Sequence, residues 1–306
     1  MAGNHAIKFC LLIECVRAHL EGEVIMSTQK WFITGASGGL GLALTEKVLA
    51  EGHHVVAAVR RVEALQSLKQ AWPDRLEVES LDVTRTEQVQ AVAARHSDVD
   101  VVVNNAGGAV IGAMEELSEA DIQHQIALNL LGPIHVTRAF LGAMRARKQG
   151  TFIHVTSVGG RAGFPSGSMY HAAKFGLEGF AEAVSQEIAE FGIKTVIIEP
   201  GSIKTDFVAN IRWAQEIDAY KDGVVGKLRQ QIKEVGDEYA SGDPVKMAGV
   251  IYTVSQMQEP PLRTVLGADA YALLEASYAR SLAELQAQKD LASSVMFAGK
   301  QGFNPL

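Results

Sequence analysis

The chain has 306 residues, of which 47% are hydrophobic and 21% are charged. This composition suffices for a large buried core and excludes a disordered protein. The formal net charge of −7 argues against a nucleic acid or an anionic membrane surface as a partner, because both need a basic protein face. We therefore expect a globular protein whose partner is a small molecule.

The first 25 residues differ from the rest of the chain. Cys10 and Cys15 are the only cysteines, so the body of the protein can form neither a disulfide framework nor a cysteine metal site. The apolar stretch around them, FCLLIECV, is far shorter than the ~20 residues of a membrane span and lacks the cleavage site of a signal peptide. Residues 1–25 are interpreted as an extension upstream of a domain that opens at Met26, or alternatively as an added interaction helix.

From Lys30 onward, short apolar runs rich in branched residues alternate with amphipathic stretches, which is typical of βαβ units and a parallel sheet. Most runs are apolar at consecutive positions, so the strands should be buried on both faces. This predicts an α/β fold in a single domain (26–290), a doubly wound, Rossmann-type, seven-stranded parallel sheet with helices on both faces, followed by a tail (291–306). The expected strands are residues 30–34, 54–59, 75–80, 100–104, 151–156, 194–199 and 263–267.

Capping residues mark two helix starts between these strands. Thr84 with Glu87 predicts a capping box before a helix over about 84–95. Ser118 with Asp121 predicts a second box before a long helix that ends near residue 145.

The C-terminal third contains a segment of different character. Residues 202–242 mix apolar and charged positions and show no strand, so they are interpreted as an insertion over one edge of the sheet. Asp243 and Pro244 should open a later helix, and an amphipathic helix is expected over 269–288. The insertion carries aromatic residues that could form a substrate lid, a dimer contact or local packing, with the lid favoured: Phe207, Trp213 and Tyr220.

The stretch TGASGGLG (34–41) follows the first expected strand and leads into a helical run. In doubly wound sheets the first βα turn binds nucleotide phosphates, because glycines let the backbone approach a pyrophosphate and the helix N-terminus attracts its charge. The spacing is T-G-x-x-x-G-x-G and not the G-x-G-x-x-G fingerprint, so a plain glycine-rich turn is the alternative. We expect a dinucleotide here, contacted by Gly35, Ser37, Gly39, Leu40 and Gly41.

The second expected strand is followed by VRRVEA, in which Arg60 and Arg61 replace the carboxylate that would bind the ribose 2′-hydroxyl of NAD. A guanidinium matches a 2′-phosphate in charge and in fork geometry. This favours NADP(H) over NAD(H), with Arg60 as the contact. The alternative is that either arginine, and Arg61 in particular, is a solvated residue at a helix entry.

The stretch YHAAK (170–174) places Tyr170 and Lys174 one helical turn apart, on one face of a helix. A cation within ~4–6 Å of a phenol favours the ionised form and so lowers its pKa from ~10. Ser157, at the end of the fifth expected strand, could hydrogen-bond a substrate oxygen that exchanges a proton with Tyr170. Alone, a Tyr–Lys pair of this spacing is typical of a surface contact, and it becomes specific only in combination.

That combination is present, and the chain resembles the short-chain dehydrogenase/reductase family, in its branch of about 250 residues. The resemblance covers roughly residues 28–270 and is closest to the hydroxysteroid- and retinol-dehydrogenase-type members, through SVGG, SMYHAAKFGLEGF and PPLRTVLG. The motifs that carry it, in the family's order, are TGASGGLG (34–41), Asp82 in LDVT, NNAG (104–107), Asn129 in LNLLGP, Ser157 in VTSVGG, YHAAK (170–174) and PGSIKT (200–205).

The resemblance implies catalytic roles for four residues. Tyr170 would be the general acid in carbonyl reduction and the base in alcohol oxidation. Lys174 would lower the pKa of Tyr170 and bind the nicotinamide ribose, and Ser157 would hold and polarise the carbonyl. Asn129 would anchor a water that links Lys174 to solvent, which explains an asparagine in an otherwise apolar helix.

The resemblance also implies further cofactor contacts. Asp82 would contact the adenine side, although it could equally be a turn former before Thr84. The NNAG stretch would shape the floor beneath the nicotinamide, although read alone it is only a strand-ending turn, and Thr205 would meet the carboxamide. The implied contacts in these two stretches and the neighbouring turn are Asn104, Ala106, Gly107, Pro200, Gly201 and Thr205.

The expected function is hydride transfer between NADP(H) and an apolar ketone, aldehyde or secondary alcohol. One alternative is an epimerase or dehydratase relative, which usually has a larger C-terminal domain and a different glycine spacing. The other is a non-catalytic NADP-sensing protein, which commonly lacks the tyrosine or the lysine. By analogy we expect a cytoplasmic homodimer or homotetramer without a membrane span, and no metal, because the nine histidines are not paired with carboxylates at ligand spacing.

Overall fold

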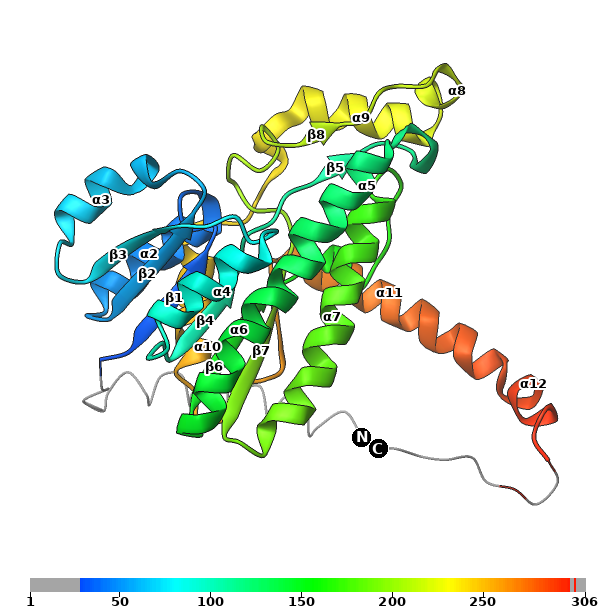
Figure 1. Ribbon diagram of the computed structural model, residues 1–306. Helices are drawn as coiled ribbons and strands as arrows, with labels where there is room; N and C mark the ends of the chain where they lie inside the picture. Colours follow the sequence, from blue (N-terminus) through cyan, green and yellow to red (C-terminus); the bar gives the residue numbers. More distant parts are fainter. Residues whose placement is uncertain (1–27, 298–299, 301–306) are drawn as a thin grey trace.

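The protein is described by a computed structural model that covers residues 28–297 and residue 300. The expected extension over residues 1–25 lies outside this range. A seven-stranded sheet in the order β3-β2-β1-β4-β6-β7-β9 forms the centre of a single domain, and every neighbouring pair of strands is parallel (Figure 1). Each expected strand is present within one residue of its predicted bounds: β1 (Lys30–Thr34), β2 (His54–Val59), β3 (Leu76–Ser80), β4 (Val101–Asn104), β6 (Gly150–Val155), β7 (Ile193–Pro200) and β9 (Arg263–Leu266).

Helices connect the strands by the crossovers that parallel pairing requires. The helix expected from Asp243 and Pro244 is α10, and the amphipathic helix expected over 269–288 is α11. The helices are α2 (Gly39–Ala50), α3 (Gln66–Ala71), α4 (Thr86–Arg95), α5 (Glu119–Ile126), α6 (Gly132–Arg147), α7 (Ser168–Ala189), α8 (Asp218–Lys221), α9 (Val224–Val235), α10 (Pro244–Ser255), α11 (Ala268–Ala287) and α12 (Lys289–Ser294).

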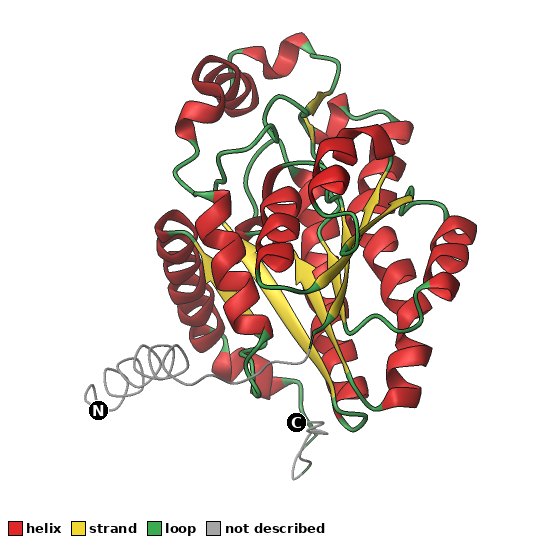
Figure 2. Cartoon of the chain, turned by 90° about the vertical axis from the view of Figure 1, so that its left-hand side faces the viewer, coloured by secondary structure: helices red, strands yellow, loops and turns green. Residues whose placement is uncertain are grey.

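The sheet is buried on both faces, as its continuous apolar strands predict (Figure 2). Successive residues of β1 alternate between the two faces: Trp31 and Ile33 pack into a core with α2 and α10, and Phe32 packs into a second core with α4, α6 and α7. Two hydrophobic layers around one parallel sheet are the doubly wound arrangement.

The two predicted capping boxes have different outcomes. Ser118 and Asp121 form the predicted box, because the Ser118 hydroxyl oxygen accepts from the Asp121 backbone N–H and the Asp121 carboxylate accepts from Ser118 N–H. The box at Thr84 is wrong: α4 begins at Thr86, and the Thr84 hydroxyl donates to the Asp82 carboxylate over 2.7 Å. Asp82 closes this turn, and its carboxylate binds the Thr84 hydroxyl that was expected to cap the helix.

The predicted long helix is not uniform. It consists of α5, a π-helical turn over Ala127–Leu131 and α6, and the π turn contains Asn129. Glu119–Arg147 as a whole is the one helical stretch of the described residues that is long and apolar enough to cross a membrane, and 33% of its most apolar window is buried. Within the protein this stretch packs against α4 and α7.

The interpretation of residues 202–242 as free of strands is wrong at one place. The two-residue strand β8 (Arg212–Trp213) pairs in parallel with β5 (Val110–Ile111) and forms a small second sheet above the main one (Figure 1). The insertion is therefore attached to the segment that follows β4.

Candidate active site

The predicted site residues come together at one edge of the sheet. Because parallel strands place their carboxyl ends at the same edge, the ends of β1, β4, β6 and β7 lie side by side in the central sheet. Thr34 and Asn104 end the first two of these strands, Ser157 lies shortly after the third, and Pro200 ends the fourth. Ligands of doubly wound sheets bind outside this edge.

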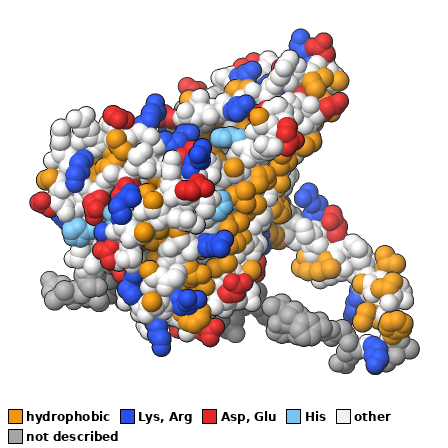
Figure 3. Space-filling model, in the orientation of Figure 1, with side chains coloured by type: hydrophobic (Ala, Val, Ile, Leu, Met, Phe, Trp, Pro, Cys, Tyr) orange, Lys and Arg blue, Asp and Glu red, His pale blue; other side chains and the backbone are white. Residues whose placement is uncertain are grey.

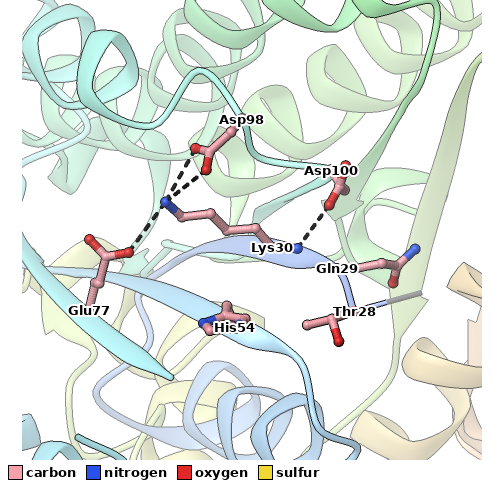
Figure 4. Close-up of a pocket in the computed structure, with 7 residues that line it drawn as sticks. All are labelled: Thr28, Gln29, Lys30, His54, Glu77, Asp98 and Asp100. Carbon is pink, nitrogen blue, oxygen red and sulfur yellow. Dashed lines mark hydrogen bonds and ion pairs between the residues drawn. The ribbon is translucent and has the colours of Figure 1, made fainter. Parts of the chain in front are cut away.

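A hollow at the opposite edge of the sheet has a different character (Figure 4). It is lined by residues at the amino ends of β1, β2 and β4, and Lys30 Nζ bridges the carboxylates of Glu77 and Asp98 over 3.3 and 3.2 Å. The Lys30 backbone N–H also donates to Asp100. Lys30 therefore connects neighbouring strand ends, and none of the predicted site residues lines this hollow.

The glycine loop has the conformation that a phosphate-binding turn needs. Gly35 and Gly39 have φ values of +67° and +52°, the left-handed region that favours glycine. A Cβ on Gly35 would lie 2.9 Å from Ala106 Cα, and a Cβ on Gly41 would overlap the carbonyl oxygen of Gly35. The loop can therefore close only with glycine at these positions.

The start of α2 fits a pyrophosphate. Gly38 is the N-cap, in extended backbone, and no side chain caps the helix, so the first backbone N–H groups have no side-chain partner. A Cβ on Gly38 would meet no atom within 4 Å, which shows open space beside the turn. An uncapped helix N-terminus beside open space is an anion-binding arrangement. Ser37 and Leu40 lie in this turn.

Asn105, a residue that the sequence interpretation did not assign, joins the glycine loop to the NNAG stretch. Its side-chain amide donates to the carbonyl oxygens of Thr34 (2.9 Å) and Gly35 (3.2 Å). The Thr34 hydroxyl in turn accepts from the backbone N–H groups of Asn105 and Ala106, both over 3.0 Å. The second asparagine of NNAG could have indicated this role, because one side-chain amide can hydrogen-bond two backbone groups at once.

Asn105→Ala is expected to lower the free energy of unfolding by about 1–3 kcal/mol and to weaken cofactor binding, because two carbonyl groups lose their donor and the loop loses its anchor. Chemical denaturation and a cofactor titration would measure the two effects. Gln288→Ala is a suitable control, because that side-chain amide donates to the backbone carbonyl of Glu284 at an exposed site at the end of α11. Unchanged cofactor affinity in Asn105→Ala would contradict the role of the anchor.

Two residues expected to contact the adenine half of the cofactor lie near the ends of β2 and β3. Arg60 directly follows β2 and is exposed. The Asp82 carboxylate accepts from both the backbone N–H and the hydroxyl of Thr84, which makes Asp82 a turn former.

The Asn104 side chain points into the protein and not toward the site edge. Its amide donates to the Thr137 hydroxyl (3.1 Å) and lies 3.3 Å from His154 Nδ1, and the residue is buried. Burial lowers the pKa of His154 to about 4, so this histidine is neutral. Asn104 can therefore shape the floor of the site through its backbone only.

Tyr170, Lys174 and Ser157 converge at the start of α7. Tyr170 and Lys174 share one helix face, and Ala173 between them is fully buried. Lys174 is buried, donates to the Val155 carbonyl oxygen over 2.9 Å, and its Nζ lies 5.9 Å from the centre of the Tyr170 ring. The Ser157 hydroxyl oxygen accepts from Gly159 N–H (3.0 Å).

The expected lowering of the Tyr170 pKa is not what the protein alone produces. Burial raises the pKa of Tyr170 above its usual 10, and the nearby Ser157 hydroxyl opposes this shift only in part. Lys174 carries less positive charge than expected, because burial lowers its pKa to about 8 while the charge of Glu178 acts in the opposite direction. Desolvation, which a sequence does not reveal, outweighs the helical pairing.

A buried acidic pair behind Lys174 was also not predicted. Glu178 and Glu199 are both buried, and Arg161 and Arg263 each approach both carboxylates within 3.0–3.7 Å. The Thr156 hydroxyl donates to Glu178 over 2.6 Å. Burial and the charge of Glu178 raise the pKa of Glu199 to about 7, so the pair holds a proton up to near-neutral pH.

Asn129 is positioned by its side chain beside the floor of the site. Its Oδ1 accepts from Gly108 N–H (3.2 Å), and its Nδ2 donates to the carbonyl oxygens of Gly108 (3.0 Å) and Gln125 (3.2 Å). A Cβ on Gly107 would lie 2.9 Å from Asn129 Oδ1 and 3.7 Å from Lys174 Nζ. The expected Asn129, Gly107 and Lys174 are thus adjacent.

The start of the insertion closes over the glycine loop. Gly201 N–H donates to the Leu266 carbonyl oxygen, and the Thr205 methyl carbon is 3.1 Å from the position of a Cβ on Gly39. Phe207, two residues later, lies edge-on to Tyr170, with ring centres 6.5 Å apart. Thr205 and Phe207 therefore lie between the two halves of the predicted site.

The three aromatic residues of the insertion have different surroundings. Phe207 has the position that a lid residue needs, and it is 42% exposed. Trp213 packs under Lys233, whose Nζ is 5.1 Å from the ring centre, and the Tyr220 hydroxyl donates to Glu115 over 2.9 Å. Only Phe207 touches the predicted catalytic tyrosine.

His171 fixes the loop that precedes α7. Its Nδ1 lies 2.8 Å from the Gly159 carbonyl oxygen, and its Nε2 accepts from Phe164 N–H over 3.0 Å. This assigns the proton to Nδ1. Among the described residues, no group of three or more histidine, cysteine, aspartate or glutamate side chains is arranged to hold a metal ion.

Known proteins are similar to this chain in sequence. The family description "short chain dehydrogenase" matches residues 29–216. An oxidoreductase of Botryotinia fuckeliana (BOA17) is 38% identical over 269 residues, which cover 86% of this chain and 96% of the relative. Human retinol dehydrogenase 8 is 30% identical over 250 residues, covering 76% and 79% of the two chains.

Solved structures agree with these matches. A short-chain dehydrogenase from Streptomyces avermitilis superposes with a TM-score of 0.81 at 37% identity, over 88% of this chain and 99% of that one. A metagenomic short-chain oxidoreductase in complex with NADP gives a TM-score of 0.62 at 25% identity, over 78% and 96% of the two chains. Fold, motif order and extended sequence identity lead to one conclusion: the chain belongs to the short-chain dehydrogenase/reductase family and is an oxidoreductase of that family.

Proposed function

We propose that the protein transfers hydride between NADP(H) and an apolar ketone, aldehyde or secondary alcohol, with Tyr170 as the general acid and base. The observation that supports this most is the convergence of Ser157, Tyr170 and Lys174 beside an uncapped, glycine-lined helix start. A proton donor and an anion-binding turn at one sheet edge are the two elements that a nicotinamide-dependent reductase needs.

The residues of the site edge fit such a cofactor. The backbone N–H groups at Gly39, Leu40 and Gly41 would bind the pyrophosphate, and Arg60 would bind a 2′-phosphate. A bound nicotinamide supplies or accepts the hydride, and the protein supplies orientation and the proton. Thr205, near Gly39, and Lys174, near Tyr170, would make the contacts to the nicotinamide half.

The proton chemistry suits carbonyl reduction at neutral pH. Because burial raises the pKa of Tyr170, the phenol is protonated and can donate to a carbonyl oxygen as negative charge develops there. Ser157 would donate a second hydrogen bond to the same oxygen. In the oxidative direction Tyr170 must first lose its proton, so oxidation should accelerate as the pH rises.

An apolar substrate is supported by apolar side chains that lie against the start of α7, where Phe207 contacts Tyr170, Met114 contacts Ser168 and Phe164 contacts His171. Phe207 and Met114 are exposed to 42% and 52%, and Phe164 is partly exposed next to His171. The relationship to retinol dehydrogenase 8 supports the same substrate class. A substrate with an extended apolar body would cover these side chains.

A substrate panel tests the proposal. Apolar ketones, aldehydes and secondary alcohols would be incubated with NADPH or NADH (NADP or NAD for the alcohols), and the nicotinamide absorbance followed. Turnover of at least one member, lost in Tyr170→Phe, is the expected result. Cofactor binding without turnover of any carbonyl or alcohol would instead favour a cofactor-sensing protein.

Arg60→Asp is expected to shift the preference from NADPH toward NADH, because a carboxylate repels the 2′-phosphate and can accept from the 2′-hydroxyl. The measurement is the ratio of kcat/KM values for the two cofactors, which we expect to change by about tenfold or more. Arg61→Asp is the matched control, because Arg61 is the exposed neighbour of Arg60 in the same turn and the substitution makes the same change of charge. Equal ratios in wild type and Arg60→Asp would contradict the role of Arg60.

A homodimer or homotetramer is proposed as well. Hydrophobic side chains gather over the middle of the face shown in Figure 3, where α6 and α7 lie in Figure 1. Exposed apolar residues of this region include Leu131 and Phe175, at 41% and 45%. Such a face is typical of an interface between subunits.

A further inference from the structure

The insertion contains a buried ion pair that the proposed chemistry does not use. Arg229, on α9, and Glu116, in the segment after β5, are only 3% and 6% exposed, and Arg229 Nη2 lies 2.6 Å from Glu116 Oε2. Arg229 Nη1 also contacts Glu216 over 2.8 Å. The two partners are 113 residues apart in the chain, so the contact joins separate segments.

Glu116 accepts hydrogen bonds from both segments that meet here, the insertion and the segment after β5, and we call their contact the junction. Its Oε1 accepts from Ile217 N–H (3.0 Å), which belongs to the insertion, and its Oε2 accepts from Ala113 N–H (2.8 Å), which belongs to its own segment. These hydrogen bonds and the charge of Arg229 keep the pKa of Glu116 below its usual value although burial alone would raise it. The carboxylate is therefore ionised in the folded protein and holds both segments.

Other contacts support the same junction but are more exposed. β8 pairs with β5, Arg212 contacts Asp121 over 2.8 Å, and the Tyr220 hydroxyl donates to Glu115. Of these polar pairs, the Glu116–Arg229 pair is the most buried, and a buried charge that loses its partner is far more costly than an exposed one.

The junction is continuous with the active site. Gly112 N–H, four residues before Glu116, donates to the Ser166 carbonyl oxygen in the loop that leads to Tyr170. On the other side the insertion carries Phe207 against the Tyr170 ring. The segment with Glu116 and the insertion with Arg229 thus approach Tyr170 from two directions.

We infer that Glu116 and Arg229 are positioning residues that fasten the insertion to the segment after β4 and so hold Phe207 as a fixed wall beside Tyr170. The fastening itself does not depend on the reaction. The consequence for substrate binding rests on the proposed function.

Limited proteolysis tests the fastening directly. The insertion contains six trypsin sites, none of which changes in Glu116→Gln: Lys204, Arg212, Lys221, Lys227, Arg229 and Lys233. This substitution keeps the shape and one oxygen acceptor but removes the charge that pairs with Arg229. We expect cleavage within residues 202–242 to be about 100-fold faster than in the wild type, because the opened population rises when a buried pair is broken.

Glu115→Gln is the matched control, since Glu115 is the exposed neighbour and accepts only from Tyr220. Its cleavage rate should stay within about threefold of the wild type. Should Glu116→Gln fold poorly, Arg229→Lys is the second variant. It retains the charge and the trypsin site but cannot contact Glu116 and Glu216 with two separate nitrogen atoms, so its cleavage should also accelerate. Cleavage at the wild-type rate in both variants would overturn the inference.

Kinetics then separate this inference from the proposed function. With a substrate identified by the panel, Glu116→Gln should raise KM for the carbonyl compound about tenfold or more while cofactor affinity stays the same. An unchanged KM together with faster cleavage would overturn the role of the wall in substrate binding. If no carbonyl or alcohol is turned over by the wild type, the proposed function fails, and the proteolysis result still decides whether the pair fastens the insertion.

Discussion

Tyr170→Phe is expected to reduce turnover by about 10²–10⁴-fold while cofactor affinity stays close to that of the wild type. The substitution removes only the hydroxyl group. The ring retains its edge contacts with His171 and Phe207, so the start of α7 should keep its structure. The loss should appear in kcat for both directions, because the same oxygen donates the proton in reduction and accepts it in oxidation.

The matched control is Tyr220→Phe, which removes an exposed hydroxyl group in the insertion that donates to Glu115. Its turnover should remain near the wild-type value, and its melting temperature should resemble that of Tyr170→Phe. A Tyr170→Phe enzyme with wild-type kcat would rule out Tyr170 as the proton donor. Loss of cofactor binding in that variant would indicate a binding role in its place.

The fold could be predicted because its determinants are local. Most strands of the sheet are runs of consecutive apolar residues, and the order of strands and helices along the chain leaves few arrangements of a parallel sheet. β8 was missed because two residues are too short to show any periodicity. The capping box at Thr84 failed because Asp82, two residues earlier, competes for the same hydroxyl group.

The site was predictable to the extent that its residues lie in short motifs. The glycine loop, Ser157, Tyr170 and Lys174 were found because their types and order are specific in combination. Asn105 and the acidic pair Glu178 and Glu199 were not found, because their partners come from distant segments and only the fold brings them together.

The direction of the Tyr170 pKa shift could not be obtained from the sequence. The spacing of YHAAK shows that a cation is near, but it does not show that both groups are desolvated. Burial raises the pKa of the phenol and lowers that of Lys174 to about 8, so each partner is shifted toward its neutral form. The charge of Lys174 beside Tyr170 is therefore set by the burial of the site as well as by pH.

Lys174→Met is expected to lose most turnover and to be no less stable than the wild type at pH 7. The difference between the ordinary pKa of 10.5 and the value of about 8 corresponds to about 3 kcal/mol that the protonated lysine costs the folded state. Loss of the hydrogen bond to the Val155 carbonyl oxygen, worth about 1.5–3 kcal/mol, offsets much of the gain. Methionine preserves the length of the side chain and is readily accommodated in a core.

The dependence of stability on pH gives the sharper measurement. A lysine with a lowered folded pKa binds fewer protons in the folded than in the unfolded state between pH 8 and 10.5, so its contribution to stability rises with pH across this window. Chemical denaturation at several pH values should show this rise in the wild type, and the Lys174→Met variant should lack it. Lys246→Met, at a side chain that is 86% exposed, should keep the wild-type slope.

Parallel stability curves for wild type and Lys174→Met would mean that the lysine is not desolvated in the folded protein and that its charge costs the folded state nothing. If the stability curves differ in slope only between pH 8 and 10.5, and turnover is lost, then the charge at position 174 lowers the stability of the folded protein but is needed for the reaction. A buried lysine whose removal leaves the protein as stable or more stable is retained for chemistry and not for folding. The two measurements on one variant therefore test whether the Tyr170–Lys174 pair is a catalytic unit or a packing contact.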